Sequence, residues 1–292
     1  MNRQETTLLA LSLFTLMTPL VSSCSSDDHE ETLSEQRLLT VEVSERPMTD
    51  ENGKALQAPT RTEAPTSTAS LTAFTMNYQT NKYNFTKSGT EWNTFSWPSG
   101  VGNNDQIDFY AYSSGSFIWD SSNPYLTFTL NSDAFNQHDL LVATHKGIAY
   151  SDTKGQVSLE FDHACAAIKF NICKTTGVAE RTIIITDVSL SGVKNRGEYH
   201  YNATDPSPVW QNLQGTQSYK LNDSDITLTT DMQELPCHYL FLPPQDKTDL
   251  TLTVSYTADG TPGSHAFTWT SGTWEAGHAY NVNISMGTAI IH

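Results

Sequence analysis

Three residues able to do chemistry lie close together in the stretch EFDHACAAIKF, which runs from Glu160 to Phe170. Asp162, His163 and Cys165 offer a carboxylate, an imidazole and a thiol, the groups of a nucleophilic site or of a metal site. A Cys–His nucleophile pair needs converging side chains and a third group that orients the base. On a β-strand, His163 and Cys165 point the same way in parallel, so they do not meet. The pattern therefore favours a structural role over catalysis or metal binding.

The residues around this stretch alternate in the way of β-strands. Alternate residues from Val157 to Cys165 share one face of a predicted strand, and from Ile168 to Ile172 the inward face has the other parity. A bulge or a passage between domains, between Cys165 and Ile168, would account for the change. Such a position also suits a buried His163 that hydrogen-bonds to backbone.

Short alternating segments recur along the whole chain, separated by clusters of Gly, Asn, Asp and Ser. Regularly spaced strands of this kind predict an all-β fold built from sandwiches. We place a boundary near Gly155, which gives an N-terminal β-sandwich domain over residues 38–155 and a C-terminal one over residues 156–292. The main expected strands cover residues 38–43, 71–78, 83–85, 92–97, 107–112, 125–130, 140–144, 157–161, 167–173, 182–190, 226–229, 239–242, 250–256, 265–269 and 279–285.

The composition excludes some classes of function. The 292 residues include 32 acidic and 16 basic ones, for a net charge of −16. Such a surface repels phosphate backbones, so we expect no nucleic-acid partner. The sequence also lacks GxSxG, HExxH and CxxC motifs and a glycine-rich phosphate loop. We therefore expect no enzyme activity, no cofactor and no metal.

The N-terminus predicts an export signal. Arg3 precedes an apolar run from Leu8 to Leu20 that is too short to span a bilayer comfortably. The sequence VSSC at residues 21–24 resembles a bacterial lipobox, in which the cysteine takes a diacylglycerol and the chain is cut before it. We therefore expect a lipoprotein signal peptide over residues 1–23 and an outer-membrane anchor through the lipid on Cys24. A plain signal peptide with an incidental cysteine is the alternative.

Residues 24–37 are polar and acidic and predict a tether. Their acidic run, SSDDHEE, resembles the surface-export signal of lipoproteins in Gram-negative gut anaerobes. A merely solvated tether is the alternative interpretation.

Three cysteines remain besides Cys24, namely Cys165, Cys173 and Cys237. An odd count rules out complete internal pairing. If Cys165 and Cys173 lie on one extended strand, they are roughly 26 Å apart, far beyond disulfide reach. We predict buried free thiols.

A strand and an exposed loop follow the tether. Residues 38–43, LLTVEV, alternate and are β-branched, whereas residues 45–70 are rich in Pro, Thr and Ala. Arg61, flanked by small residues in this loop, is an easy protease target. Arg46 is a poorer target because Pro47 follows it.

Six segments then occur in a specific order and spacing, and together they resemble the fimbrillin family of pilin lipoproteins from Gram-negative gut and oral anaerobes. The family's F-x-H element, closed by a second Phe, corresponds to Phe161, His163 and Phe170, and its role there is structural. The segments are EWNTFSWP (91–98), IDFYAY (107–112), DLLVA (139–143), VSLEFDHA (157–164), FLPPQ (241–245) and WEAGHAY (274–280).

The resemblance implies two transthyretin-like β-sandwich domains in tandem and assembly by strand exchange. An arginine-specific protease removes the N-terminal segment, and a strand from another subunit fills the groove. In this sequence it implies Cys24 for lipidation, Arg61 for the cut and Thr62 as the mature N-terminus. The exchangeable strand would contain Leu38, Leu39, Val41 and Val43.

One departure affects the expected role. Residues 287–292, after the last expected strand, are short for the donor segment that stalk subunits keep. We therefore expect a structural and adhesive minor or tip subunit, with other fimbrial subunits and host or bacterial surface ligands as partners.

The alternative is a surface lipoprotein that binds glycans or host ligands without polymerising. Trp119 and Trp210 would then stack on sugars, although both also fit packing inside the sandwiches. A glycosidase would need paired carboxylates, which one sequence cannot identify.

Overall fold

The computed structural model describes residues 36–56, 71–202 and 209–291. This part of the chain is nearly all β, as its β-branched and aromatic alternation predicts. The predicted all-β sandwich fold is confirmed. The described helical elements are one turn of α-helix, α1 (Tyr150–Thr153), and 3₁₀ turns at Ala134–Asn136, Thr176–Val178 and Lys247–Asp249.

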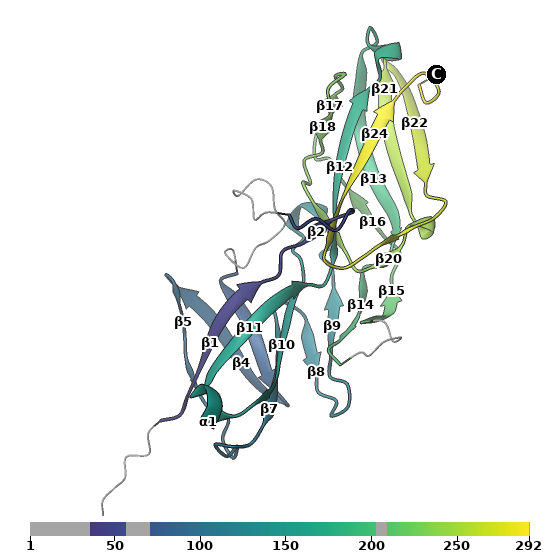
Figure 1. Ribbon diagram of the computed structural model, residues 1–292. Helices are drawn as coiled ribbons and strands as arrows, with labels where there is room; N and C mark the ends of the chain where they lie inside the picture. Colours follow the sequence, from purple (N-terminus) through teal and green to yellow (C-terminus); the bar gives the residue numbers. More distant parts are fainter. Residues whose placement is uncertain (1–35, 57–70, 203–208, 292) are drawn as a thin grey trace, which may run out of the picture. The chain divides into compact units, whose positions relative to one another are not determined.

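An eight-stranded sheet organises the first half of the described chain, in the order β5-β4-β3-β7-β10-β11-β1-β6. Its two end strands are joined by only Asn93 and Thr94, and Phe95 of β6 packs against Phe85 of β4 with ring centroids 4.9 Å apart. The sheet therefore curves back on itself. Figure 1 shows β1, β4, β5, β7, β10 and β11 of this sheet grouped together. Its strands are β1 (Leu38–Glu45), β3 (Ala73–Tyr78), β4 (Asn81–Ser88), β5 (Glu91–Trp92), β6 (Phe95–Ser96), β7 (Ile107–Tyr112), β10 (Leu141–Ile148) and β11 (Gln156–His163).

The remaining described strands form smaller sheets, in the orders β18-β12-β24-β2, β16-β13-β21-β22, β15-β14-β9-β8 and β20-β23, with β19 beside β12 and β17 beside β13. Their bounds are β2 (Thr49–Asp50), β8 (Ser116–Ile118), β9 (Tyr125–Thr129), β12 (Ala166–Lys174), β13 (Ile183–Val193), β14 (Arg196–His200), β15 (Trp210–Gln214), β16 (Gln217–Lys220), β17 (Ile226–Thr227), β18 (Gln233–Glu234), β19 (Leu240–Leu242), β20 (Gln245–Asp246), β21 (Thr251–Ala258), β22 (Thr261–Thr268), β23 (Thr273–Trp274) and β24 (His278–Met286).

Buried hydrophobic side chains form two cores among the described residues. Phe161 is the last buried residue of the first core, and from Ala164 onward the buried hydrophobic residues belong to the second, so the final passage lies between β11 and β12. This passage accounts for the change of parity between Cys165 and Ile168. Residues before Gly155 also reach the second core, for example Leu126 on β9. The division into domains at residues 155 and 156 stays a prediction.

Most of the predicted strands are present, with bounds shifted by a few residues, and the strand predicted at residues 38–43 extends to Glu45. The single strand predicted at residues 92–97 was wrong, because the chain turns at Asn93 and Thr94 and forms the separate short strands β5 and β6. Several very short strands were not predicted, because two to four residues are too few to show an alternation. One of them, β2, lies inside the segment predicted to be a loop and pairs with β24. The thiols of Cys165, Cys173 and Cys237 are free and buried, as predicted.

Candidate functional site

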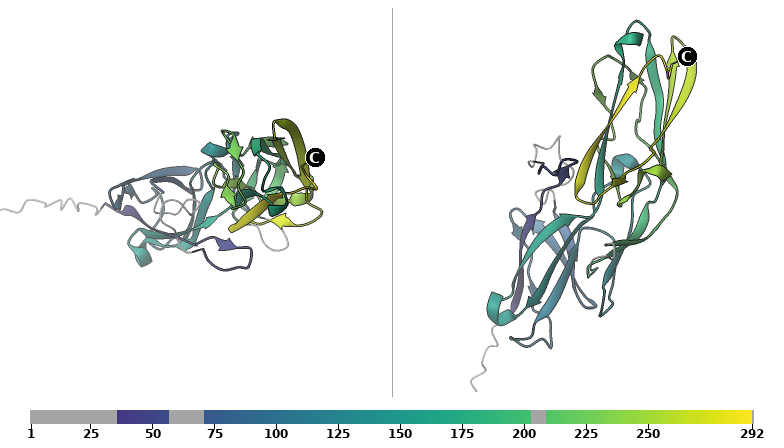
Figure 2. Two further views of the ribbon diagram at one scale, coloured as in Figure 1. Left: turned by 90° about the horizontal axis from the view of Figure 1, so that it is seen from above. Right: turned by 45° about the vertical axis from the view of Figure 1, so that its right-hand side comes forward.

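The first strand occupies a slot between two others. β1 runs parallel to β11, from the pair Thr40–Gln156 to the pair Glu45–Phe161, and antiparallel to β6 on its other side. The purple β1 lies along the teal β11 in each view (Figures 1 and 2). Among the described strands, β1 is the element that joins β11 to β6. Without it, the curved sheet would have an open seam.

The side chains of β1 alternate between the core and the solvent. Leu39 is fully buried, and Val41 and Val43 pack against the first core while keeping some exposure. Leu38 points the other way and is 40% exposed. Burying a side chain such as Leu39 stabilises a fold by about 1.5–3 kcal/mol. Of the four residues predicted for the exchangeable strand, three therefore face the core, and Leu38 only contributes backbone to the strand.

Gly155 allows β1 to lie close to the chain beside it. A Cβ atom at Gly155 would lie 1.8 Å from the carbonyl oxygen of Leu38, and the φ angle there is +84°. Both the space and the backbone conformation thus require glycine. The carbonyl oxygen of Gly155 in turn accepts a hydrogen bond from the amide of Thr40 at 2.9 Å.

The other end of β1 meets a buried histidine. Glu45 continues the inward parity of Val41 and Val43, and its carboxylate lies 2.7 Å from Nε2 of His163. Nδ1 of the same ring lies 2.5 Å from Oδ2 of Asp139. The side chains of His163, Asp139 and Glu45 are 1%, 0% and 12% exposed. The end of β1 is therefore held by a buried carboxylate–imidazole–carboxylate cluster.

The cluster favours a protonated imidazole. Burial alone would lower the pKa of His163, but the hydrogen bonds and charges of Asp139 and Glu45 outweigh it and raise this pKa to about 9. Burial also raises the pKa of Asp139, and its bonds to His163 and Cys165 partly offset that effect. At neutral pH both ring nitrogens of His163 carry protons, so both donate hydrogen bonds.

Arg46, the next residue, faces the solvent side. Its guanidinium lies 2.7 Å from the carboxylate of Glu160 and 2.8 Å from that of Asp162, with the arginine side chain 62% exposed. Exposed ion pairs of this kind contribute about 0–1 kcal/mol. The two sides of this strand end therefore differ: the inward pair is buried and the outward pair is solvated.

These contacts explain the stretch EFDHACAAIKF. His163 is buried, but its partners are two carboxylates, so the expected bond to backbone was wrong. Cys165 is fully buried, and burial together with the negative charge of Asp139 raises the pKa of its thiol well above the usual value. A thiol held protonated is a poor nucleophile. Within the described ranges, no group of His, Cys, Asp and Glu side chains could hold a metal ion.

The two tryptophans predicted for ligand binding lie in different surroundings. Trp119 is half-buried and packs at an angle against Tyr110. Trp210 is buried, donates from Nε1 to the carbonyl of Ala164 at 2.7 Å, and meets Tyr199 edge-on. The cavity that Trp210 lines does not include Trp119.

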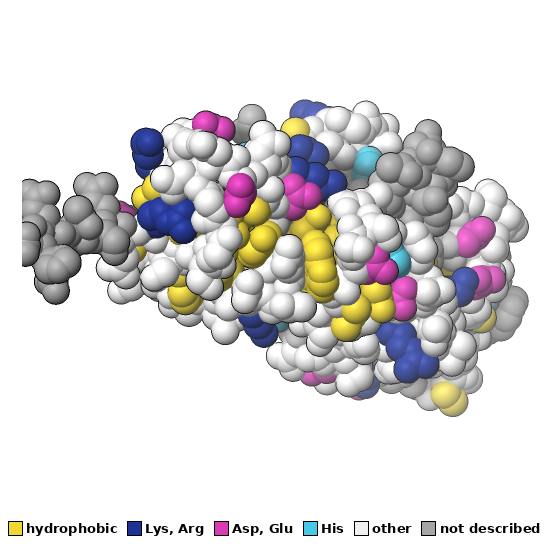
Figure 3. Space-filling view, turned by 90° about the horizontal axis from the view of Figure 1, so that it is seen from below, with side chains coloured by type: hydrophobic (Ala, Val, Ile, Leu, Met, Phe, Trp, Pro, Cys, Tyr) yellow, Lys and Arg dark blue, Asp and Glu magenta, His cyan; other side chains and the backbone are white. Residues whose placement is uncertain are grey.

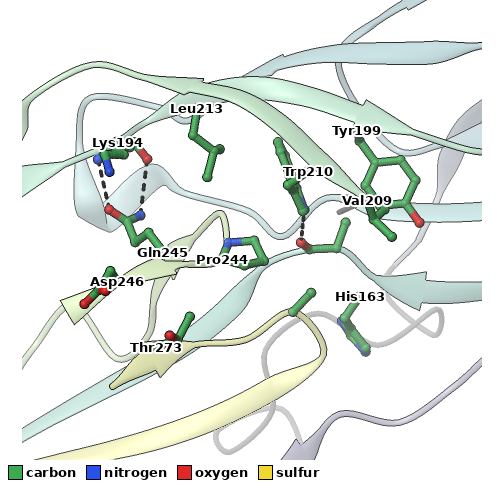
Figure 4. Close-up of a pocket in the computed structure, with 12 residues that line it drawn as sticks. His163, Lys194, Tyr199, Val209, Trp210, Leu213, Pro244, Gln245, Asp246 and Thr273 are labelled. Atoms are coloured by element: carbon green, nitrogen blue, oxygen red, sulfur yellow. Dashed lines mark hydrogen bonds between the residues drawn. The ribbon is translucent and has the colours of Figure 1, made fainter. Parts of the chain in front are cut away.

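Trp210 does line a cavity of about 490 Å³ (Figure 4). Tyr199, Val209 and Leu213 give it an apolar side, and Gln245 and Thr273 a polar one. Gln245 is occupied by two hydrogen bonds to the backbone of Lys194. On the face seen in Figure 3, hydrophobic side chains form short bands between polar and charged groups. The exposed large hydrophobic side chains of the described residues include Val209 of this cavity. They are Leu38, Ile118, Phe135, Val209 and Met232.

Three predicted processing residues, Cys24, Arg61 and Thr62, lie outside the described residues. Conversely, the sequence analysis missed Glu45 and Asp139 as partners of His163. The signal for Glu45 was its parity, because it follows Val43 on the inward side of an apolar row. Asp139 carried a weaker signal, as the first residue of the segment DLLVA.

Comparison with known proteins identifies the class of protein to which this sheet and its first strand belong. Residues 48–292 match the fimbrillin-like family. The match covers most of the chain, which therefore belongs to the fimbrillin-like family, as the sequence resemblance indicated. A search of curated proteins found no matching sequence.

Solved structures provide further likenesses. A candidate cell adhesion protein of Bacteroides eggerthii superposes with a TM-score of 0.53 at 12% identity, covering 88% of each chain, and it supports the fold. A fimbrial protein of Bacteroides vulgatus gives 0.49 at 15% identity, covering 86% of this chain and 95% of its own. A candidate cell adhesion protein of Bacteroides uniformis gives 0.49 at 17% identity, covering 87% and 95%.

Family membership defines the general role. The chain is a fimbrial protein of the cell surface that contacts other fimbrial subunits, and it is not an enzyme. In the part of the chain that the structure describes, no helix is both long enough and apolar enough to cross a membrane.

Proposed function

We propose that the chain is a lipid-anchored precursor of a fimbrial subunit that assembles by strand exchange. The observation that carries the proposal is the position of β1, which fills the seam between β11 and β6 with one side of apolar residues. A strand at a seam is replaceable by an extended segment of another chain, because main-chain hydrogen bonds can form with any sequence and side-chain pockets supply the specificity.

The processing steps fit the order of the elements. Cys24 would carry the lipid, and Arg61 lies in sequence between β2 and β3, which begins at Ala73. A cut after Arg61 would separate β1 and β2 from the rest of the chain and give a mature N-terminus at Thr62. The seam would then be free for a strand from another subunit.

A minor or tip position agrees with the packing of the last described residues. Ile291 is buried in the second core, and the carbonyl of Ile290 accepts a hydrogen bond from Tyr256 at 2.7 Å. These residues are engaged by their own subunit, which supports a role in which they are not given to a neighbour.

The test uses the purified precursor and an arginine-specific protease. We expect a new N-terminus at Thr62 and, after cleavage, ladders of oligomers that resist mild denaturation. Arg61→Gln should prevent both, and the matched control Arg46→Gln should prevent neither. Cys24→Ser should abolish incorporation of labelled fatty acid in the cells that export the protein. Cleavage elsewhere, or a cleaved chain that stays monomeric, would contradict the proposal.

A non-polymerising surface protein that binds glycans is the second candidate, and the cavity beside Trp210 favours it. A precursor that resists the protease but is retained by glycans on an array would support it. Leu213→Trp, which would fill the cavity, should then abolish retention, whereas Phe135→Ala at an exposed site should not.

A further inference from the structure

One end of the slot filled by β1 contains the protonated side chain of His163. This charge favours some incoming strands over others. We infer that the slot accepts a parallel strand with a row of inward apolar residues. Two positions after the last of these residues, the strand carries an aspartate or glutamate that binds His163. The inference rests on the strand exchange proposed above and identifies the incoming partner by its chemistry. The position in question is that of Glu45, which follows Leu39, Val41 and Val43 on the inward side.

The histidine is held in place independently of β1. Asp139 is fully buried, and its carboxylate binds Nδ1 of His163 through one oxygen and the amide of Cys165 through the other, at 3.2 Å. Neither Asp139 nor Cys165 belongs to the segment that exchange would remove. The ring therefore keeps its orientation, with Nε2–H directed at the position of Glu45.

The register of the strand sets which residue reaches His163. Val41 pairs with Val157 and Val43 with Leu159, so Glu45 lies beside Phe161, two residues before His163. Glu42, the other acidic residue of β1, has the opposite parity and is exposed. A strand shifted by one residue would turn its apolar row to the solvent, so register and charge are recognised together.

The chemistry favours a carboxylate over other side chains. An apolar residue at this position would leave the buried Nε2–H of His163 without an acceptor. An amide oxygen would accept the bond, but hydrogen bonds between charged groups are shorter and roughly twice as strong as neutral ones. We therefore expect an amide at this position to weaken strand uptake by about tenfold or more.

The experiment compares three labelled peptides on one receptor. A recognition site for a sequence-specific protease is inserted between residues 57 and 70 of the full chain, so that cutting does not depend on Arg61. The cut protein is then incubated in mild denaturant with peptides of residues 36–47. The peptides are the natural sequence, Glu45→Gln and the matched control Glu42→Gln, which makes the same charge change on the outward side.

We expect the natural and Glu42→Gln peptides to bind alike and the Glu45→Gln peptide to bind about tenfold more weakly or worse. On a His163→Gln receptor, the natural and Glu45→Gln peptides should bind equally. If His163→Gln does not fold, the comparison of the three peptides on the unmodified receptor still tests selection by the carboxylate. Equal uptake of all three peptides would uphold strand exchange and overturn selection by the carboxylate. Uptake of none would overturn both.

Discussion

Two strands complete their sheets in the same manner, one near each end of the described chain. β1 runs parallel to β11, and β24 runs parallel to β12, the strand that follows β11. Their ends differ: the inward row of β1 finishes at Glu45 against a buried histidine, whereas the inward residues of β24 finish at the buried Met286. The same topology thus has a charged contact in one half and an apolar one in the other.

This difference indicates which of the two strands is held less firmly in its sheet. β24 pairs with β12 over eight residue pairs and continues into Ile290 and Ile291, which pack against the second core. β1 has six pairs with β11 and two with β6, and only Leu39 of its inward row is fully buried. We therefore expect β1 to be the strand that separates first, and the cluster around His163 to control its release.

The largest effect should come from removing the histidine. His163→Ala leaves the buried carboxylates of Asp139 and Glu45 facing each other without the cation between them. Breaking a buried ion pair costs roughly 3–5 kcal/mol, so urea unfolding should show a loss of that order. The neighbouring Arg46→Ala, which removes an exposed pair, should cost about 1 kcal/mol or less. Similar losses in the two variants would contradict the contrast between the inward and outward sides.

A change at the opposite end of β1 should come next. Gly155→Ala places a Cβ against the carbonyl of Leu38 and forces alanine into a left-handed conformation, at a cost of about 1–3 kcal/mol from the backbone alone. Gly89→Ala is the control, because its φ of +63° is also left-handed but nothing lies within 4 Å. Limited proteolysis should release the segment containing β1 faster in Gly155→Ala than in Gly89→Ala. Equal rates would show that the close approach does not hold β1.

A reversible effect should follow from pH. The pKa of His163 is about 9 in the folded protein against an ordinary 6.5, so its contribution to stability is complete below pH 6.5 and is lost as the pH rises through 9. The groups facing His163 are Glu45 and Asp139, with Asp162 adjacent. The pKa of Asp139 is also raised, so its titration likewise lowers the stability as the pH rises. The urea concentration at the midpoint of unfolding should decrease as the pH rises from 6.5 to 9, and it should decrease less in Glu45→Gln. A midpoint that rises over this range would refute the assignment.

The smallest effect should appear in the second half. Tyr256→Phe removes the hydroxyl that donates to the carbonyl of Ile290, which should cost about 1 kcal/mol. Hydrogen exchange should then quicken at residues 287–291 while β1 remains unaffected. Faster exchange in β1 would mean that β1 and β24 are coupled and do not open independently.

The sequence predicted the fold more completely than the site. Alternation over six residues, as in LLTVEV, is enough to identify a strand. The free thiols were predicted from their odd number together with the separation of Cys165 and Cys173 along one strand. The cluster at His163 could not be found in this way, because Glu45, Asp139 and His163 come from three separate parts of the chain. Only the pairing of β1 with β11 brings Glu45 to the ring. The parity of Glu45 hinted at an inward carboxylate, but parity alone does not supply its partner.

The distance along the chain between β1 and its partner has a consequence for folding order. Glu42 and Ser158 lie side by side in the pair yet are 116 residues apart in sequence. Contacts that close so long a loop form slowly, since the loss of chain entropy comes before the gain in contacts. We therefore expect β1 to close the sheet after the rate-limiting step, when β3, β7, β10 and β11 are already assembled. Val41→Ala should accordingly speed unfolding and leave the refolding rate unchanged in stopped-flow experiments, and slower refolding would place β1 in the folding nucleus.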